Sequence, residues 1–336
     1  MAMFTFVSDW VIQDVIILIL AMAVVIFIAK NEEHPAIIYL EMFSFCFLYA
    51  AVYENFATLP VTVGMPYYAY GRSIIMIFNV PLTVPLIEYL VVYSSLRLAR
   101  HMDLPNWCKP FFVGFMGMLF DFTMDPVAVQ QIFTTAEGTV GRWTWFLLMP
   151  SDVNIYGEPV FNFSGWVLLC GYAALFLLLG RQWYEKSGYK TRVGYAYPPL
   201  MMLCSLMALV AAPVSQFLLW MEPIFHRGSI GEWIMLGVYF ALPTILLSYY
   251  WRGKMKSAFS IKSEYPAFLV LVVLHFSDIL FAIAGGFWEI LWLEFLFTGV
   301  QSLIVGMVFF QGKRMKKDLE PPIPVNEKNI SPDSSL

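Results

Sequence analysis

The chain has 336 residues, a formal net charge of -4, 60% hydrophobic residues and only 13% charged residues. Soluble domains carry about 25% charged residues, so this composition excludes a soluble globular protein and indicates an integral membrane protein. The sequence contains no basic patch typical of nucleic-acid binding, and no nucleic-acid partner is expected.

Nine apolar runs approach the roughly 20 residues that a transmembrane helix needs. They are predicted at Trp10 to Ala29, Ile37 to Leu59, Ser73 to Leu96, Lys109 to Phe133, Phe163 to Leu179, Tyr197 to Met221, Glu232 to Trp251, Tyr265 to Ile283 and Phe287 to Phe310. Only residues 284–286 separate the last two, and they could instead form a kink in a helical hairpin. The sequence therefore predicts an all-α, polytopic transmembrane bundle of about eight to nine spans.

Basic residues follow alternate spans, beginning with Lys30 after the first. The intervening loops hold only Arg72, Arg142 and Arg227. This asymmetry predicts a multi-pass protein of the cell membrane with its amino terminus outside and its carboxyl terminus in the cytoplasm.

Residues 1–312 are predicted to form a single transmembrane domain, with a candidate active-site segment at residues 121–166. Residues 313–336 include several prolines among polar residues and are predicted to be a disordered cytoplasmic tail. The four cysteines are scattered without the spacing of a metal site or a disulfide framework. No metal is expected.

Acidic residues inside apolar spans are the first candidates for chemistry, because a buried charge in a membrane is costly. Asp121 and Asp125 are four residues apart and share one face of a continuous helix, where one carboxyl could stay protonated as a general acid. The alternative for Asp125 is a helix cap, since Pro126 follows it. Glu54 is either catalytic or an interfacial acid, and Glu88 lies so deep that it should be neutral or paired.

Two further features surround these acids. His275 and Asp278 share a helix face and could relay protons, although a hydrogen-bonded buried histidine is the commoner case. Aromatic residues are dense near the two aspartates, and aromatic faces stabilise a nearby cation. They include Trp143, Trp145, Tyr156 and Trp166. Acids beside aromatic faces suit carbocation chemistry.

Several spaced motifs together resemble the carotenoid biosynthesis membrane protein family, which includes the acyclic carotenoid hydratases such as bisanhydrobacterioruberin hydratase. The matching residues are Asp125-Pro126-Val127-Ala128, Trp143-Thr144-Trp145, Tyr156-Gly157-Glu158-Pro159, and Asn162-Phe163 with Gly165-Trp166. Upstream, Glu54, Gly64, Pro66, Tyr68, Tyr70, Val80, Pro81, Leu82 and Pro85 also fit. The resemblance covers roughly residues 50–170. It departs from the family pattern at Glu88 and Tyr89, close to where a tryptophan is expected.

The resemblance implies acid-catalysed addition of water to a terminal double bond of an acyclic carotenoid, through a tertiary carbocation and without a cofactor. The catalytic candidates are Asp121, Asp125 and Glu54, of which an aspartate would donate the proton and Glu54 or the other aspartate would activate water. The substrate-binding candidates are Asn55, Tyr70, Glu88, Trp143, Trp145, Tyr156, Asn162 and Trp166. The expected partners are a lipophilic carotenoid or isoprenoid, membrane lipid and other enzymes of the carotenoid pathway.

Two other classes remain open at this point. A proton- or cation-coupled transporter could use Glu54, Glu88, Asp121 and Asp278 as an ion path, although no repeat relates the two halves of the chain. A related isoprenoid cyclase or lyase could quench the same cation differently. A retinal photoreceptor is disfavoured, because no lysine lies in the core of a late span.

Overall fold

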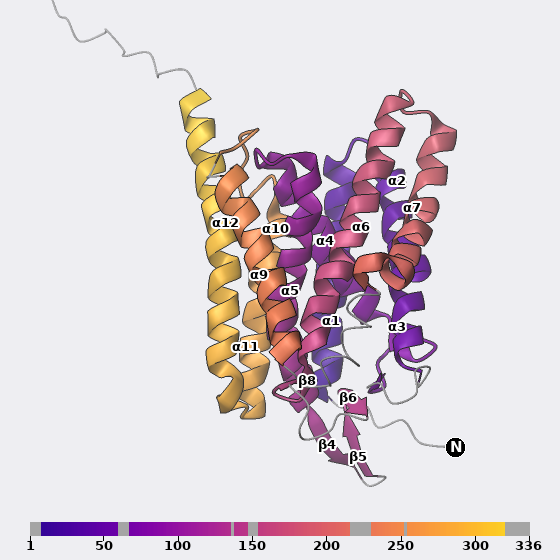
Figure 1. Ribbon diagram of the computed structural model, residues 1–336, viewed down its shortest axis with the longest axis vertical. Helices are drawn as coiled ribbons and strands as arrows, with labels where there is room; N and C mark the ends of the chain where they lie inside the picture. The colour runs from indigo at the N-terminus through magenta and orange to yellow at the C-terminus, as the bar shows by residue number, and fades with distance from the viewer. Residues whose placement is uncertain are drawn as a thin grey trace, which may run out of the picture.

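Long helices form most of the protein (Figure 1). The computed structural model describes residues 8–59, 67–135, 138–146, 154–215, 230–251 and 254–319. The long helices are α1 (Ser8–Asn31), α4 (Thr83–His101), α5 (Lys109–Gln130), α6 (Val160–Lys186), α7 (Thr191–Ala211), α9 (Ile230–Leu246) and α12 (Leu291–Leu319). The shorter ones are α2 (Pro35–Ser44), α3 (Ala51–Ala57), α10 (Tyr265–Phe268) and α11 (Leu274–Gly285).

Short turns of other helix types join or extend several of these helices. The π-helical turns are η1 (Phe45–Ala50), η3 (Leu247–Trp251) and η4 (Leu269–Val273), and the 3-10 turns are η2 (Asn106–Cys108) and η5 (Trp288–Ile290). Because η1 links α2 to α3 and η4 links α10 to α11, each pair forms one membrane-length helix. Within the described residues, eight helices are long and apolar enough to cross a membrane. The predicted helical membrane bundle is confirmed.

The helix α4 is shorter than the sequence predicted and differs from the other spans. The predicted span began at Ser73, but two short strands, β2 (Met76–Ile77) and β3 (Val80–Pro81), precede α4. Because this hairpin takes up the first part of the predicted span, the helix begins only at Thr83. Helix α4 itself carries Glu88 and two arginines. It packs against α1, α5 and α6 and buries nearly all its side chains. It therefore meets protein where the other spans meet lipid.

Antiparallel strand pairs gather at one end of the bundle (Figure 1). Strand β1 (Tyr67–Tyr70) pairs with β6 (Trp143–Phe146) so that Tyr68 faces Trp145 and Tyr70 faces Trp143. The other pairs are β4 (Ile132–Thr135) with β5 (Gly138–Gly141), and β7 (Asn154–Ile155) with β8 (Glu158–Pro159). The β1–β6 pair brings two aromatic segments together that are more than 70 residues apart in the sequence.

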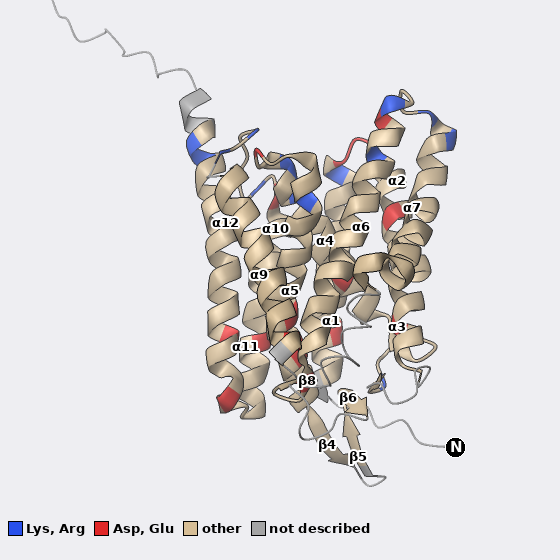
Figure 2. Cartoon of the chain, in the orientation of Figure 1, with Lys and Arg blue, Asp and Glu red and all other residues tan. Residues whose placement is uncertain are grey.

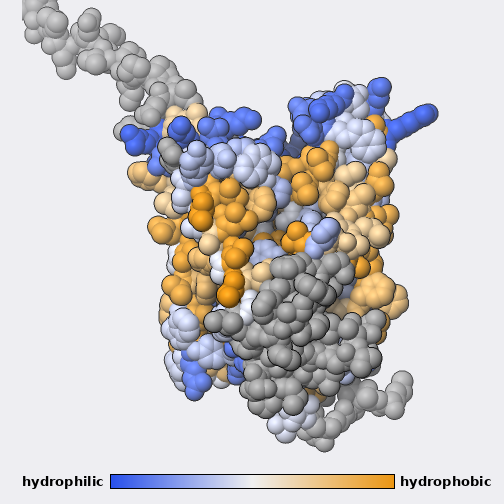
Figure 3. Space-filling model, viewed as in Figure 1, coloured by the Kyte–Doolittle hydropathy of each residue, from blue (hydrophilic) through white to orange (hydrophobic). Residues whose placement is uncertain are grey.

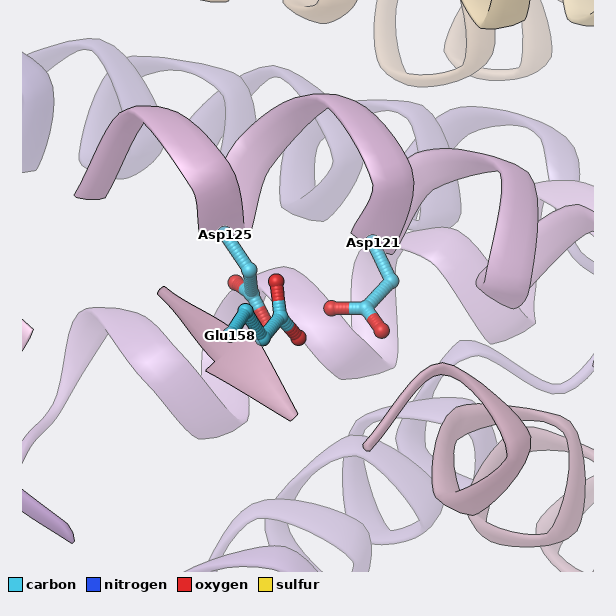
Figure 4. Close-up of side chains that lie close together, drawn as sticks. All are labelled: Asp121, Asp125 and Glu158. Carbon is cyan, nitrogen blue, oxygen red and sulfur yellow. The ribbon is translucent and has the colours of Figure 1, made fainter. Parts of the chain in front are cut away.

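Helix α5 is continuous through Pro126, so the interpretation of Asp125 as a helix cap is wrong. Asp125 lies inside the helix, and the chain leaves α5 only after Gln130. Proline in a helix removes one backbone hydrogen bond, and packing of the surrounding helices must offset that loss. The predicted shared face for Asp121 and Asp125 is confirmed (Figure 4).

Charge and hydropathy divide the bundle along its length. Lysines and arginines gather at the end where α12 finishes and where α6 turns toward α7 (Figure 2). Among the coloured residues of the visible face, hydrophobic side chains predominate on both sides of the middle, below the hydrophilic end (Figure 3). This pattern fits a protein that spans a bilayer, and the side on which the basic end lies remains a prediction from the positive-inside rule.

The last helix extends past the predicted domain boundary. Residues 313–319 belong to α12, whereas the sequence predicted that a disordered tail begins at residue 313. This stretch is rich in lysine, arginine, methionine and leucine, which favour helices. The remaining tail, residues 320–336, lies outside the described residues. All four cysteines are free, as predicted.

A buried ionic cluster ties α4 to the loop before α10 and to the loop after α1. The Arg97 guanidinium donates to both carboxylate oxygens of Glu264, with Nε 2.8 Å from Oε2, and to Glu32 Oε1 at 2.8 Å. His101 Nε2 lies 2.9 Å from Glu264 Oε1. Removing one member of a buried pair leaves an uncompensated charge. We expect Arg97→Ala to cost about 3 to 5 kcal/mol of stability, measured as a lowered unfolding midpoint in detergent.

The same cluster should make stability depend on acid pH. Burial by itself would raise the pKa of Glu264, but its contacts with His101 and Arg97 outweigh burial and hold the pKa below its usual value. A depressed carboxyl pKa contributes stability above the unfolded value and loses it as the pH falls through the folded value. Glu264→Gln should therefore flatten the loss of stability below about pH 4.5, measured by thermal unfolding across that range.

Candidate active site

A cavity of about 90 Å³ lies between α1, α3, α4, α5, α6 and α11, beneath the β1–β6 pair. Its polar lining residues are Gln13, Asp14, Glu54, Tyr68, Tyr70, Arg72, Ser73, Thr83, Glu88, Asp125, Arg142, Asn162, Ser277 and Asp278. Its large apolar lining residues include Trp10, Phe120, Trp143 and Trp166. A space of this size admits the end of a long ligand but not its length.

Glu54, on α3, forms one wall of the cavity and is buried. The hydroxyls of Tyr68 and Tyr70 donate to its Oε2 atom at 2.7 and 2.6 Å. Both tyrosines come from β1, two residues apart, so their side chains lie on the same face of the strand. The pairing of β1 with β6 holds this strand in place. Two donors on one carboxylate oxygen stabilise its negative charge and leave Oε1 for another partner.

Glu88, on α4, lines the same cavity as Glu54. It is buried, and its Oε2 atom has no hydrogen-bond partner among the described residues. Carboxyls that lie near one another in a medium of low polarity are not all charged, because adjacent negative charges repel strongly there.

Asp125 lies on the wall formed by α5, and the side chains of Asp121 and Glu158 lie close to it (Figure 4). All three carboxyl groups are buried. The Asn162 amide nitrogen lies 2.5 Å from Glu158 Oε1, 3.2 Å from Asp125 Oδ2 and 3.4 Å from Asp121 Oδ2. Burial raises the pKa of Glu158 well above its usual value, and the neighbouring Asp125 raises it further. Of these three acids, only Asp125 lines the cavity.

Close packing of α5 against α6 sets the distance between these acids and Asn162. A Cβ atom on Gly114 would lie 2.5 Å from the Val167 carbonyl oxygen, and one on Gly117 would lie 2.6 Å from Cys170 Sγ. Glycine is therefore needed at both positions for the helices to approach this closely. Larger residues would push Asn162 away from the carboxyl groups.

The three acids lie close enough together to be considered as ligands of a metal ion. One carboxylate oxygen from each of Asp121, Asp125 and Glu158 lies within 4.8 Å of the others, a spacing that a hard cation such as Mg²⁺ could bridge. The Asn162 nitrogen, a hydrogen-bond donor, faces all three groups and stands where a cation would bind. The cluster suits carboxyl groups that share protons better than it suits a metal.

Aromatic side chains cover the cavity from the strand side. Trp143 is buried and stacks with Tyr70 at a centroid distance of 6.2 Å and an interplanar angle of 7°. Trp143 also meets the edge of Tyr68, and Trp166 on α6 lies against Phe120. The faces of these rings provide the negative potential that stabilises a cation.

A second polar group, which the sequence analysis missed, lies at the α1 side of the cavity. Asp14 Oδ1 accepts a hydrogen bond from Thr83 at 2.8 Å, and Oδ2 accepts one from Ser73. Arg142 Nη2 lies 3.8 Å from Asp14, while its Nη1 atom is buried without a partner. An acid within the first apolar helix was the available signal for this group.

Seven of the eleven predicted site residues line the cavity: Glu54, Tyr70, Glu88, Asp125, Trp143, Asn162 and Trp166. Asp121 contacts the same Asn162 amide as Asp125 but does not line the cavity. Trp145 packs against the edges of Tyr68 and Phe161 and is absent from the lining.

Two predicted residues serve other contacts. The Asn55 amide donates to the Ala51 and Ile77 carbonyls at 2.7 and 3.1 Å, which ties α3 to the β2–β3 hairpin. The Tyr156 hydroxyl donates to the Glu289 carbonyl at 2.8 Å, tying the turn before β8 to the start of the last transmembrane segment. Neither side chain lines the cavity. Both residues are close in sequence to residues that line the cavity. Their positions on the helix and in the turn point their side chains toward backbone carbonyls instead.

The pair on α11 separates into two roles. His275 is buried, and its Nδ1 atom is hydrogen-bonded to the Thr123 hydroxyl at 2.8 Å. Asp278 lines the cavity and has a buried oxygen, Oδ2, without a hydrogen-bond partner. His275 therefore fits the structural interpretation, whereas Asp278 joins the acids around the cavity.

A sequence model of the family described as carotenoid biosynthesis protein matches residues 13–226, more than half of the chain. The chain belongs to this family. The comparisons with curated proteins and with solved structures found no match. The matched region of this carotenoid biosynthesis protein contains nearly all of the cavity lining, and only Trp10 and the residues from α11 lie outside it.

Proposed function

We propose that this carotenoid biosynthesis protein adds water to a terminal trisubstituted double bond of an acyclic carotenoid. The observation that carries the proposal is a cavity that combines carboxyl groups from different helices with aromatic side chains. Alkene hydration by acid catalysis needs a proton donor, a shield for the tertiary cation and a base for water. The cavity contains a candidate for each.

Asp125 is the proposed proton donor. Of the three clustered acids, only Asp125 lines the cavity. One carboxylate oxygen from each of Asp121 and Glu158 lies within 4.8 Å of an Asp125 oxygen. Three buried carboxyls this close cannot all be charged, so the cluster retains protons, and Asp125 is the member that could pass one into the cavity. Transfer of that proton to the CH carbon of the double bond breaks the π bond and leaves the positive charge on the tertiary carbon, which bears the two methyl groups.

Glu54 is the proposed base. Hydrogen bonds from Tyr68 and Tyr70 to Oε2 favour its charged form, and its Oε1 atom would accept a proton from water. As the water oxygen bonds to the tertiary carbon, Glu54 takes one of its protons. The product is a tertiary alcohol.

The aromatic groups shield the cation before water attacks. Trp143 and Tyr70 present stacked rings to the cavity, and Trp166 covers the side formed by α6. Their faces stabilise positive charge without offering a nucleophile. The polyene itself would remain in the lipid of the cell membrane and insert only its end, because it is soluble nowhere else.

Expression in a host that accumulates lycopene tests the proposal. We expect a more polar pigment whose mass is greater by one water per modified end, detected by liquid chromatography with mass spectrometry. A cyclic product without added oxygen would indicate a cyclase. An unaltered pigment together with proton flux in vesicles reconstituted with the protein would indicate a transporter. Either result contradicts hydration.

A further inference from the structure

The α1 side of the cavity is more polar than the end of a hydrocarbon requires. Five side chains on this side form a set that we call the Asp14 group: Gln13, Asp14, Ser73, Thr83 and Arg142. They come from α1, from the residues on either side of the β2–β3 hairpin and from the residue before β6. The proposed proton donor, Asp125, and the proposed base, Glu54, line the same cavity from other helices.

The hydrogen bonds within the Asp14 group leave both acceptors and a donor for a further molecule. The hydroxyls of Ser73 and Thr83 donate to Asp14, with Thr83 Oγ1 2.8 Å from Oδ1. Because each hydroxyl uses its only proton there, its oxygen can still accept a hydrogen bond. Gln13 Oε1 is a further acceptor and Arg142 Nη1 a donor, and both atoms are buried without a hydrogen-bond partner among the described residues.

Water satisfies these atoms better than a carotenoid end does. A hydrocarbon offers no hydrogen bonds, and a buried polar atom without a partner is costly. A water molecule donates and accepts, and it needs only about 10 to 15 Å³ of a cavity that measures about 90 Å³. The cavity therefore has room for more than one water molecule, and its polar side favours water while its aromatic side chains favour the carotenoid.

Arg72 connects this side of the cavity with the surface. It lines the cavity and is exposed, and an exposed guanidinium stays in contact with water. The preceding residue, Gly71, holds the segment close to α1, because a Cβ atom there would collide with the Trp10 ring. The Gly71 amide also donates to the Arg142 carbonyl at 2.7 Å. An exposed arginine and the buried side chains of α1 are thereby brought to one cavity.

We propose, on the basis of the proposed function, that the Asp14 group binds the water consumed in hydration and that this water enters past Arg72. The group transfers no proton and forms no bond with the carotenoid. It holds water in the cavity that also contains Glu54 and Asp125, so that water is present when the carbocation forms.

The fate of the carbocation in D₂O tests the water-binding role. Protonation then places deuterium on the CH carbon, and the cation is either captured by water or loses a proton or deuteron to the Glu54 carboxylate, which re-forms the double bond. Purified protein in nanodiscs would be incubated with lycopene, and mass spectrometry would measure the hydrated product and the deuterium in recovered lycopene. For Thr83→Val we expect about 10-fold less product, with deuterium exchange retained or increased.

The matched control is Thr298→Val, because Thr298 is another buried threonine but does not line the cavity. It should leave product and exchange unchanged. Should Thr83→Val fail to fold, Ser73→Ala removes the other hydroxyl that donates to Asp14 and should give the same result. If product and exchange fall together, or if product does not fall, the water-binding role is overturned.

Thiol labelling tests the entry route without relying on activity. Thr83 and Thr298 are both only 4% exposed, so a difference between them reports access through the cavity. A small, charged methanethiosulfonate added to protein in nanodiscs should modify Thr83→Cys but not Thr298→Cys, with the wild type as the baseline for the native cysteines. No modification of Thr83→Cys above that baseline overturns the route. Modification without hydrated product from the wild-type protein would support the route and overturn the proposed function instead.

Discussion

Asp125→Asn should lower the rate of hydration by about 100- to 10,000-fold while the protein accumulates normally in the membrane. Asparagine has nearly the same shape and can still hydrogen-bond within the cluster around Asn162, but it has no proton that can be transferred to an alkene. The measurement is pigment conversion in lycopene-producing cells, normalised to the protein content of the membrane.

Asp121→Asn is the control for this variant. Asp121 lies in the same cluster and on the same helix face but does not line the cavity. We expect a smaller loss of rate than for Asp125→Asn, because the substitution changes only the charge of a neighbouring group and leaves the Asp125 carboxyl in place. If both variants lose the protein itself, the cluster is a packing element. Equal loss of activity in both would contradict the assignment of Asp125 as the donor.

Glu54→Gln should also remove most of the activity, again by about 100- to 10,000-fold. The glutamine oxygen can still accept the hydroxyls of Tyr68 and Tyr70, so the wall keeps its shape. The amide cannot take a proton from water as the carbon–oxygen bond forms. The measurement is the first-turnover rate of purified protein with lycopene.

Tyr70→Phe gives a graded companion to this experiment. It deletes one hydrogen bond to a charged oxygen, which is worth about 1.5 to 3 kcal/mol, and it keeps the ring that stacks on Trp143. Its first-turnover rate should lie between those of the wild type and Glu54→Gln. A rate as high as that of the wild type would mean that the Glu54 charge does not contribute to water attack.

Periodicity and local spacing predicted part of the cavity lining. The four-residue interval between Asp121 and Asp125 placed both on one face of α5, because a helix repeats about every 3.6 residues. The density of aromatics predicted a wall that includes Trp143 and Trp166. The same local reasoning placed Asn55 in the site, where the turn into the β2–β3 hairpin directs it to the backbone instead.

Contacts between segments far apart in sequence were not predictable in this way. Glu158 lies 33 residues after Asp125, and it reaches the cluster because the β7–β8 turn folds back toward α5. Asp14 lies on the first helix and Arg142 lies just before β6, and the two meet at the cavity. Such pairings depend on how helices pack, which a single sequence does not display.

The amino-acid sequence by itself determined that this protein is a helical membrane bundle with acids in apolar surroundings, because hydropathy and helix period are properties of consecutive residues. Only the tertiary structure decided which acids share a cavity. Glu54 on α3, Glu88 on α4 and Asp125 on α5 come together through close helix packing and through the strand pair that carries Tyr68 and Tyr70. The physical reason is that side-chain packing across helices selects the partners of each buried carboxyl, and the cost of isolated charge makes those partners necessary.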